Sequence, residues 1–195
     1  MNAGRPLQFN PDKALDAAMQ LFWRKGYEST SLQNLIDEMK LSKSSFYLAF
    51  KSKHHLFQLC LQQYSEMLFN HLSSQMLQAD SAMQFIESLF YNVANETCGK
   101  DARRGCLLMN TASEFAQTDS EISKLVNKNL ENLTKIFEQA VIEAIKENKN
   151  LSDKDSHKLA LYLVSSMSGL KTMVKSGADK PTIKSIVGTI LLPLR

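Results

Sequence analysis

The stretch FWRKGYESTSLQNLIDEMKLSKSSFYLAFKSKHHLF, residues 22–57, decides the fold of this chain of 195 residues. Its apolar positions recur at helical spacing and predict two short helices, about 31–39 and 43–50, joined by a tight turn. We expect Thr30 to cap the first helix through a capping box with Gln33, and Ser42 to cap the second. The apolar side chains that would hold the two helices together are Leu35, Met39, Leu41 and Phe46.

The same helical period continues on both sides of this stretch. Asn10-Pro11 predicts a first helix that begins at Pro11 and is closed by Gly26. Further helices are expected over about 53–77, 80–98, 106–116, 119–148, 152–176 and from 180 onward. No run is better explained as a strand. The sequence therefore predicts an all-α protein of about nine helices, with a three-helix module over residues 1–52 and a larger helical domain over residues 53–195.

The charge of the chain is unevenly distributed. The formal net charge of +3 belongs wholly to residues 1–60, which carry eight Lys and Arg against five acids, with His54 and His55 beside them. If any part of the chain faces a polyanion, it is this one. An ordinary solvated surface can carry the same charge, so charge alone leaves both interpretations open.

Motifs of common enzymes and metal sites are missing from the sequence. It has no P-loop, Rossmann, nucleophile-elbow or HExxH pattern, and the cysteines Cys60, Cys98 and Cys106 form no CxxC pair. We therefore expect no enzyme activity, no cofactor and no metal. No apolar run approaches the ~18 residues that span a bilayer, and the first residues lack the apolar core of a secretory signal, which predicts a cytoplasmic protein without a membrane partner.

Two short helices joined by a tight turn, the second opening on basic and hydroxyl residues, meet the physical requirements of a helix-turn-helix. The second helix must fit a major groove about 12 Å wide, and its first residues must reach base edges. Lys43, Ser44 and Ser45 suit such contacts, while Tyr47 and Lys53 would reach phosphates. Pairs of helices of this kind also occur as pure packing units, and the spacing alone does not separate the two.

Residues 22–57 resemble the DNA-binding module of the TetR family of bacterial repressors. The likeness lies in aromatic-x-x-x-Gly-Tyr, then Thr-Ser-hydrophobic, Leu-Ser-Lys, aromatic-Tyr and Phe-x-Ser-Lys. It implies a double-stranded DNA operator as partner and a recognition helix over 42–50. Lys40 stands where the family commonly has Gly, so either it holds a positive φ at a cost of about 1 kcal/mol or the turn differs. The positions that usually contact DNA correspond to Ser31, Ser42, Lys43, Ser44, Ser45, Tyr47 and Lys53.

The segment before the first helix is short, basic and without periodicity. Arg5 could lie in the minor groove, as the arms of homeodomains do, or belong to a frayed terminus. Gly4-Arg5-Pro6, like RGCLLMNTASEF at 104–115, resembles one branch of the TetR family.

The resemblance implies that the C-terminal part is a regulatory domain, in which the last two helices of each subunit form a four-helix dimer interface. Both helices carry apolar stripes, which need either a partner subunit or burial inside the chain. We expect Leu170 and Ile186 to be exposed for the partner. The stripes consist of Leu159, Leu163, Met167, Leu170 and Val174, and of Ile183, Ile186, Val187, Ile190 and Leu191.

The family's middle helices enclose an effector. Their apolar faces in this chain predict an uncharged, partly apolar small molecule. A stripe of Met and aromatic residues is also the usual content of a protein core, so each residue could serve either purpose. The candidate lining residues are Phe85, Leu89, Phe90, Val93, Met109, Phe115, Phe137, Tyr162 and Met167.

Cys106 has two possible roles. Arg103, Arg104 and the amides that open the next helix would stabilise its thiolate and make it reactive to oxidants or electrophiles, with Cys98 as a resolving partner. Alternatively, Cys106 is a small residue that packs the start of that helix.

The leading hypothesis from the sequence is a homodimeric repressor that binds a pseudo-palindromic operator and is released by a small-molecule effector. The alternative trigger is modification of Cys106. Two rivals belong to other classes: a DNA-coating protein indifferent to sequence, and a ligand-binding or enzymatic helical domain that only retains the fold. The near-neutral overall charge weakens the first rival, and the missing catalytic motifs weaken the second.

Overall fold

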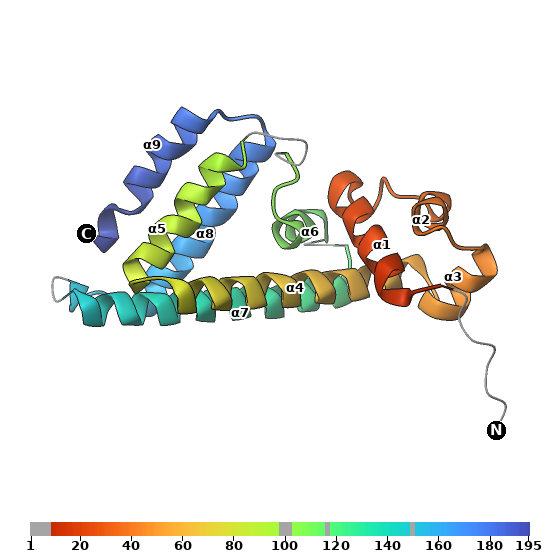
Figure 1. Cartoon of the computed structure of the whole chain (residues 1–195), viewed down its shortest axis with the longest axis horizontal. Helices are drawn as coiled ribbons and strands as arrows, with labels where there is room; N and C mark the ends of the chain where they lie inside the picture. The colour runs from red at the N-terminus through yellow and green to blue at the C-terminus, as the bar shows by residue number, and fades with distance from the viewer. Residues whose placement is uncertain (1–8, 98–102, 116–117, 149–150) are drawn as a thin grey trace, which may run out of the picture. The chain divides into compact units, whose positions relative to one another are not determined.

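The computed structural model describes residues 9–97, 103–115, 118–148 and 151–195. These residues form nine α-helices and no strand, which confirms the predicted all-α fold (Figure 1). A short 3-10 helix, Leu192–Leu194, follows the last of them. The helices are α1 Pro11–Lys25, α2 Leu32–Met39, α3 Lys43–Phe50, α4 Lys53–Gln78, α5 Ala82–Asn95, α6 Leu107–Phe115, α7 Ser120–Glu147, α8 Ser156–Lys175 and α9 Lys180–Ile190.

Side-chain caps begin several of these helices. Asn10 caps α1 and Asp119 caps α7, and Ser42 caps α3 as predicted. The capping box of α2 is one residue later than expected. The Ser31 hydroxyl accepts from the Asn34 N–H at 3.1 Å, and the Asn34 side chain accepts from the Ser31 N–H at 3.2 Å.

Three predicted helix starts are corrected by the structure. Thr30 does not cap α2, because it is buried and its hydroxyl donates to the Gly26 carbonyl at 2.6 Å. Helix α5 begins only after Ser81, whose hydroxyl accepts from the third residue of the helix. Helix α8 begins at Ser156 rather than Ser152, because Asp155 provides its cap. The predicted helix ends at Cys98 and Ala116 lie outside the described residues.

The chain divides into two compact units, Met1–Glu66 and Met67–Arg195. The first unit therefore extends into α4, beyond the predicted boundary at residue 52. Buried residues on the first turns of α4 explain the extension. The Phe57 ring packs edge-on against Phe22 of α1 with centroids 4.9 Å apart, and the Cys60 Sγ lies 3.8 Å from the Leu15 carbonyl oxygen. These contacts fasten the start of α4 to α1.

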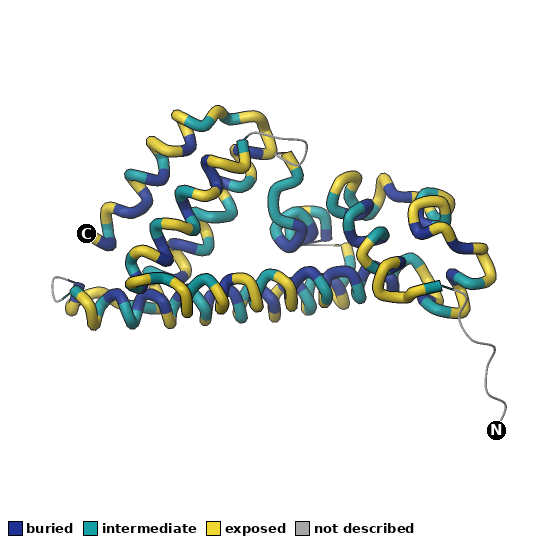
Figure 2. Tube along the Cα trace, in the orientation of Figure 1, coloured by how far each residue is buried: buried dark blue, intermediate teal, exposed yellow. Residues whose placement is uncertain are grey.

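The second unit has its core among α5, α7, α8 and α9 (Figure 2). Phe90 of α5 and Phe137 of α7 meet there with ring centroids 6.3 Å apart. Most of the apolar stripes of α8 and α9 lie in this core, and the expectation that Leu170 is exposed is wrong, since it is 1% exposed. No helix in the described part of the chain is long and apolar enough to cross a membrane.

Candidate nucleic-acid interface

Backbone hydrogen bonds close the turn between α2 and α3. The Lys40 N–H donates to the Asp37 carbonyl at 3.2 Å, and the Leu41 N–H donates to the Ile36 carbonyl at 3.1 Å. This pair of bonds defines a Schellman motif, which requires a left-handed residue after the helix. Lys40 occupies that position with φ 54° and ψ 44°, which confirms that a non-glycine residue holds the turn. This left-handed conformation costs about 1 kcal/mol. Lys40 is exposed and lies three residues before the first residue of α3.

Three serine hydroxyls cluster at the start of α3. The Ser42 hydroxyl accepts from the Ser45 N–H at 3.1 Å and lies 3.0 Å and 2.8 Å from the hydroxyls of Ser44 and Ser45. The cap satisfies one of the N–H groups that the helix leaves unpaired at its first turn. The hydroxyl donors and acceptors that this cap does not use lie at the N-terminus of α3, together with the positive end of the helix dipole. They can bind an anion or a base edge there.

The two faces of α3 differ sharply. Phe46 and Phe50 are buried and join the core of the first unit, together with Leu41 in the turn. Lys43, Ser44, Tyr47 and Leu48 are exposed on the opposite side. The helix therefore presents a cation, a hydroxyl, a phenol and an apolar side chain to solvent, while its aromatic residues anchor it.

Cations also flank the C-terminal end of α3. Lys51 is exposed and has φ 62°, a second non-glycine residue with positive φ. The Lys53 Nζ lies 4.0 Å from the centroid of the Tyr27 ring, a cation–π contact that fixes the start of α4. Ser31 is exposed at the start of α2 but is engaged in its capping box. The structure thus brings Lys43, Ser44, Ser45 and Tyr47 together on α3. The predicted contact Arg5 lies outside the described residues.

Sequence reasoning missed two features of this surface. Sequence reasoning gave Leu48 no role, although its side chain is 76% exposed. Lys51 carries no sequence signal, because its positive φ follows from the bend between α3 and α4 rather than from its residue type.

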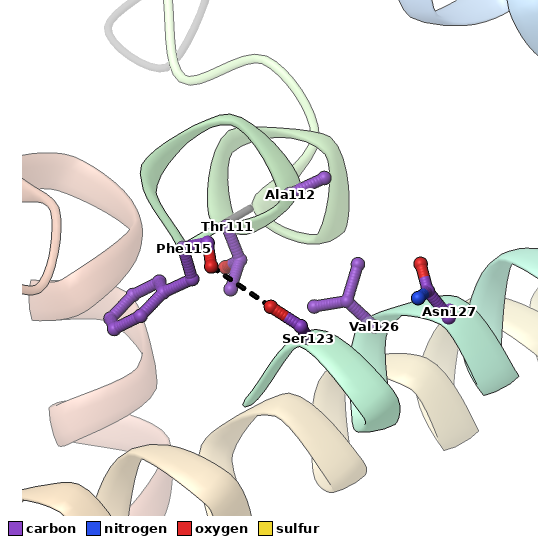
Figure 3. Close-up of a pocket in the computed structure, with 6 residues that line it drawn as sticks. All are labelled: Thr111, Ala112, Phe115, Ser123, Val126 and Asn127. Atoms are coloured by element: carbon purple, nitrogen blue, oxygen red, sulfur yellow. Dashed lines mark hydrogen bonds between the residues drawn. The ribbon is translucent and has the colours of Figure 1, made fainter. Parts of the chain in front are cut away.

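In the second unit, a cavity of about 200 Å³ lies between α6 and α7 (Figure 3). Its walls are Thr111, Ala112 and Phe115 from α6, and Ser123, Val126 and Asn127 from α7. The Ser123 hydroxyl donates to the Phe115 carbonyl at 2.9 Å, and the Thr111 hydroxyl donates to the Leu107 carbonyl at 2.8 Å. The lining contains no charged side chain.

Only one of the predicted lining residues, Phe115, belongs to this cavity. The others lie elsewhere in the second unit. Tyr162 is 37% exposed, and its hydroxyl donates to the Ile190 carbonyl at 3.1 Å. Phe85, Phe90, Val93 and Phe137 are buried in the core, and Leu89, Met109 and Met167 pack against it. Thr111, Ser123 and Asn127 were not predicted, because small polar residues give no periodic signal.

Cys106 directly precedes α6, is half-buried and forms no disulfide. Its carbonyl accepts from the Asn110 N–H at 2.9 Å. The Asn110 side chain donates to the Arg104 carbonyl at 2.8 Å and accepts from the Lys175 Nζ at 3.0 Å. One amide therefore ties the segment around Cys106 to the last turn of α8. Cys98 lies outside the described residues.

The solvent face of α8 carries apolar side chains that the core does not use. Leu161 is 49% exposed, and Tyr162 and Met173 are each 37% exposed. Gly169 lies between them on the same face, and a Cβ at Gly169 or at Gly188 of α9 would meet nothing within 4 Å. A second helix could approach this face closely.

Two family models match the chain. One, described as bacterial regulatory proteins of the tetR family, matches residues 14–60, and the other, described as a tetracyclin repressor-like C-terminal domain, matches residues 69–187. The HTH-type transcriptional repressor ComR of Escherichia coli (strain K12) is 26% identical over 189 residues, which cover 96% of this chain and 90% of ComR. The HTH-type transcriptional repressor BdcR of the same strain is 39% identical over 61 residues, or 31% of each chain.

The architecture is similar to a solved protein–DNA complex. A cysteine mutant of the TetR family transcriptional regulator CifR, bound to 26-base-pair operator DNA, matches with a TM-score of 0.84 and 25% identity, covering 96% of this chain and 98% of that chain. The match of both family models, in the order of the two compact units, agrees with this likeness. The chain therefore belongs to the TetR family and is a transcriptional regulator of that family.

Proposed function

We propose that the chain is a homodimeric repressor that binds a pseudo-palindromic operator through α3 and releases it when an effector binds the second unit. The exposed N-terminal turn of α3 carries the proposal, because Lys43 and the serine cluster stand free of the core on a helix that Phe46 and Phe50 hold in place. Lys43 and Ser45 would contact base edges, with Ser42 and Ser44 beside them. Ser31, Tyr47, Lys53 and Arg5 would contact the DNA backbone or the minor groove.

The exposed face of α8 supports a dimer. Leu161, Tyr162 and Met173 place apolar surface in water, and Gly169 gives a partner helix room to approach. A twofold contact between α8–α9 pairs would bury this surface as a four-helix bundle. Ile186, half-buried on α9, would extend it. The dimer would place two copies of α3 on successive turns of one DNA face, which is the geometry that a palindromic site requires.

The cavity between α6 and α7 supports an uncharged effector with an aromatic or aliphatic body. Phe115 and Val126 supply apolar walls, and the polar groups of Thr111, Ser123 and Asn127 can orient a ligand. A ligand there would press on the last turns of α6. Because Asn110 links the first turn of α6 to Lys175 of α8, a shift of α6 would reach the proposed dimer helix.

Two variants test this effector site. Ala112→Trp should fill the cavity and abolish release by any effector, while operator binding stays intact. Ser113→Trp is the matched control, because Ser113 is exposed on the other side of α6. Release that persists at the same effector concentration in Ala112→Trp would contradict this location.

Modification of Cys106 is a second candidate trigger, favoured by its position. Cys106 immediately precedes the helix whose end lines the cavity, so an adduct there would displace the same helix. Cys106→Ser separates the two triggers. It should abolish release by an alkylating agent such as N-ethylmaleimide and leave release by a cavity ligand unchanged.

The experiment that tests the proposed function is selection of duplexes from a random pool by the full-length protein, followed by sedimentation of the complex. The expected result is one palindromic sequence bound by two chains. Recovery of duplexes with no shared sequence would favour a DNA-coating protein, and recovery of none would contradict DNA binding.

A further inference from the structure

Leu48 is an apolar side chain at the centre of the exposed face of α3. It is 76% exposed, and Phe46 and Phe50, two residues to either side, are buried. Helical residues two positions apart point in nearly opposite directions, so Leu48 projects away from the core of the first unit. Ser44, one turn earlier, lies on the same line along the helix.

The exposed large hydrophobic side chains described in the first unit are confined to this face. They are Tyr47, which is 46% exposed, and Leu48. The surrounding exposed residues are polar or cationic, namely Lys43, Ser44 and Lys51. Leucine cannot pair with a phosphate or donate to a base edge. It therefore stands inside a surface suited to DNA without the chemistry that a phosphate contact needs.

Thymine offers a matching apolar group. Its major-groove edge carries a 5-methyl group, which marks a thymine by an apolar contact rather than by a hydrogen bond. Four helical residues span about 6 Å, so Leu48 would reach a base about two steps from the one below Ser44. We propose that Leu48 packs on the 5-methyl group of one thymine in each half-site and makes the protein specific for that base. This inference rests on the proposed binding of DNA through α3.

Removal of the methyl group tests the proposal directly. Each thymine of the selected site is replaced in turn by deoxyuridine, which keeps base pairing and lacks only the 5-methyl group. Loss of one buried methyl group corresponds to about a fourfold weaker affinity per half-site, and about fifteenfold when both half-sites are changed. We expect one symmetric pair of thymines to show this loss with the unmodified protein.

The Leu48→Ala variant tests whether Leu48 is the side chain that contacts the methyl group. It should bind the thymine and deoxyuridine sites equally, because the side chain that senses the methyl group is gone. Leu48→Met should keep most of the sensitivity. Leu77→Ala is the matched control, since Leu77 is an 85% exposed leucine on α4 in the second unit, and it should behave as the unmodified protein does.

Three results would overturn the inference. Replacement of thymine by deoxyuridine could leave the affinity unchanged at every position, or the loss of affinity could be as large in Leu48→Ala as in the unmodified protein. The third result is that Leu48→Ala only weakens the association of two dimers bound side by side on DNA. The last would assign Leu48 to a protein contact. If the unmodified protein binds no duplex at all, the proposed function fails first, and the two failures are therefore distinguishable.

Discussion

Replacing Gly169 by Arg should stabilise the single chain and break the dimer. A Cβ at this position meets nothing within 4 Å, so the chain itself accommodates a side chain. Glycine inside a helix costs about 0.8–1 kcal/mol relative to good helix formers such as arginine, and the variant should gain most of that amount in unfolding free energy. In a dimer packed across this face, twofold symmetry would bury two unpaired guanidinium groups. An unpaired buried charge costs about 3–5 kcal/mol, which raises the dimer dissociation constant at least a hundredfold.

Sedimentation at several concentrations measures the dissociation constant, and urea unfolding of the monomeric fraction measures the stability. Operator affinity should fall about 10²–10⁴-fold, because each half-site then binds independently. Ser88→Arg on the exposed side of α5 is the control and should leave the dimer unchanged. A Gly169→Arg protein that sediments as a dimer of unchanged strength would refute the assignment of this face.

Other perturbations have defined outcomes. Lys40→Gly should relieve the left-handed strain and raise the free energy of unfolding in urea by up to about 1 kcal/mol, and it should weaken operator binding because the charge is lost. Lys40→Gln should weaken operator binding equally without raising the free energy of unfolding. Hydrogen bonds from Thr182 lower the pKa of Asp179, and those from Lys158 lower the pKa of Asp155, below the value of 3.8. Their stabilisation is present above pH 3.8 and is lost as pH falls through the lowered values, so the melting temperature of the double Asp→Asn variant should depend less on pH there. Burial, and then the charge of Asp16, raise the pKa of the Cys60 thiol, so mass spectrometry after brief iodoacetamide treatment at pH 8 should find Cys60 unlabelled in the folded protein.

The helices of the first unit could be predicted from sequence because the residues that determine them are close together in the chain. Ser42 as a cap, the apolar spacing of Phe46 and Phe50, and the turn at Lys40 each depend on a few neighbouring residues. The cap of α2 was misplaced by one residue because Thr30 and Ser31 are both good caps. Burial of Thr30 decides between them, and burial is a property of the folded unit.

The second unit was harder to predict for a physical reason. Periodicity identifies the apolar side of α8 but not what covers it, so it could not decide between a partner subunit and burial inside the chain. Leu170 was expected to be exposed for a partner, although the core formed with α5, α7 and α9 buries it together with Leu163. The exposed face with Leu161 and Gly169 does not carry apolar residues at regular helical spacing, so the sequence pattern did not predict it. Small side chains such as Thr111 and Ala112 leave the space for the cavity. The spacing of apolar residues in the sequence does not predict such a space.

The base preference of a Lys43→Ala variant tests most directly the claim that α3 reads DNA. Binding of the unmodified and variant proteins is measured against every single base-pair substitution of the selected operator. We expect Lys43→Ala to lose about 1–3 kcal/mol of affinity and its discrimination at one symmetric pair of positions, with preferences elsewhere unchanged. A variant with full affinity and the same preference at every position would contradict it.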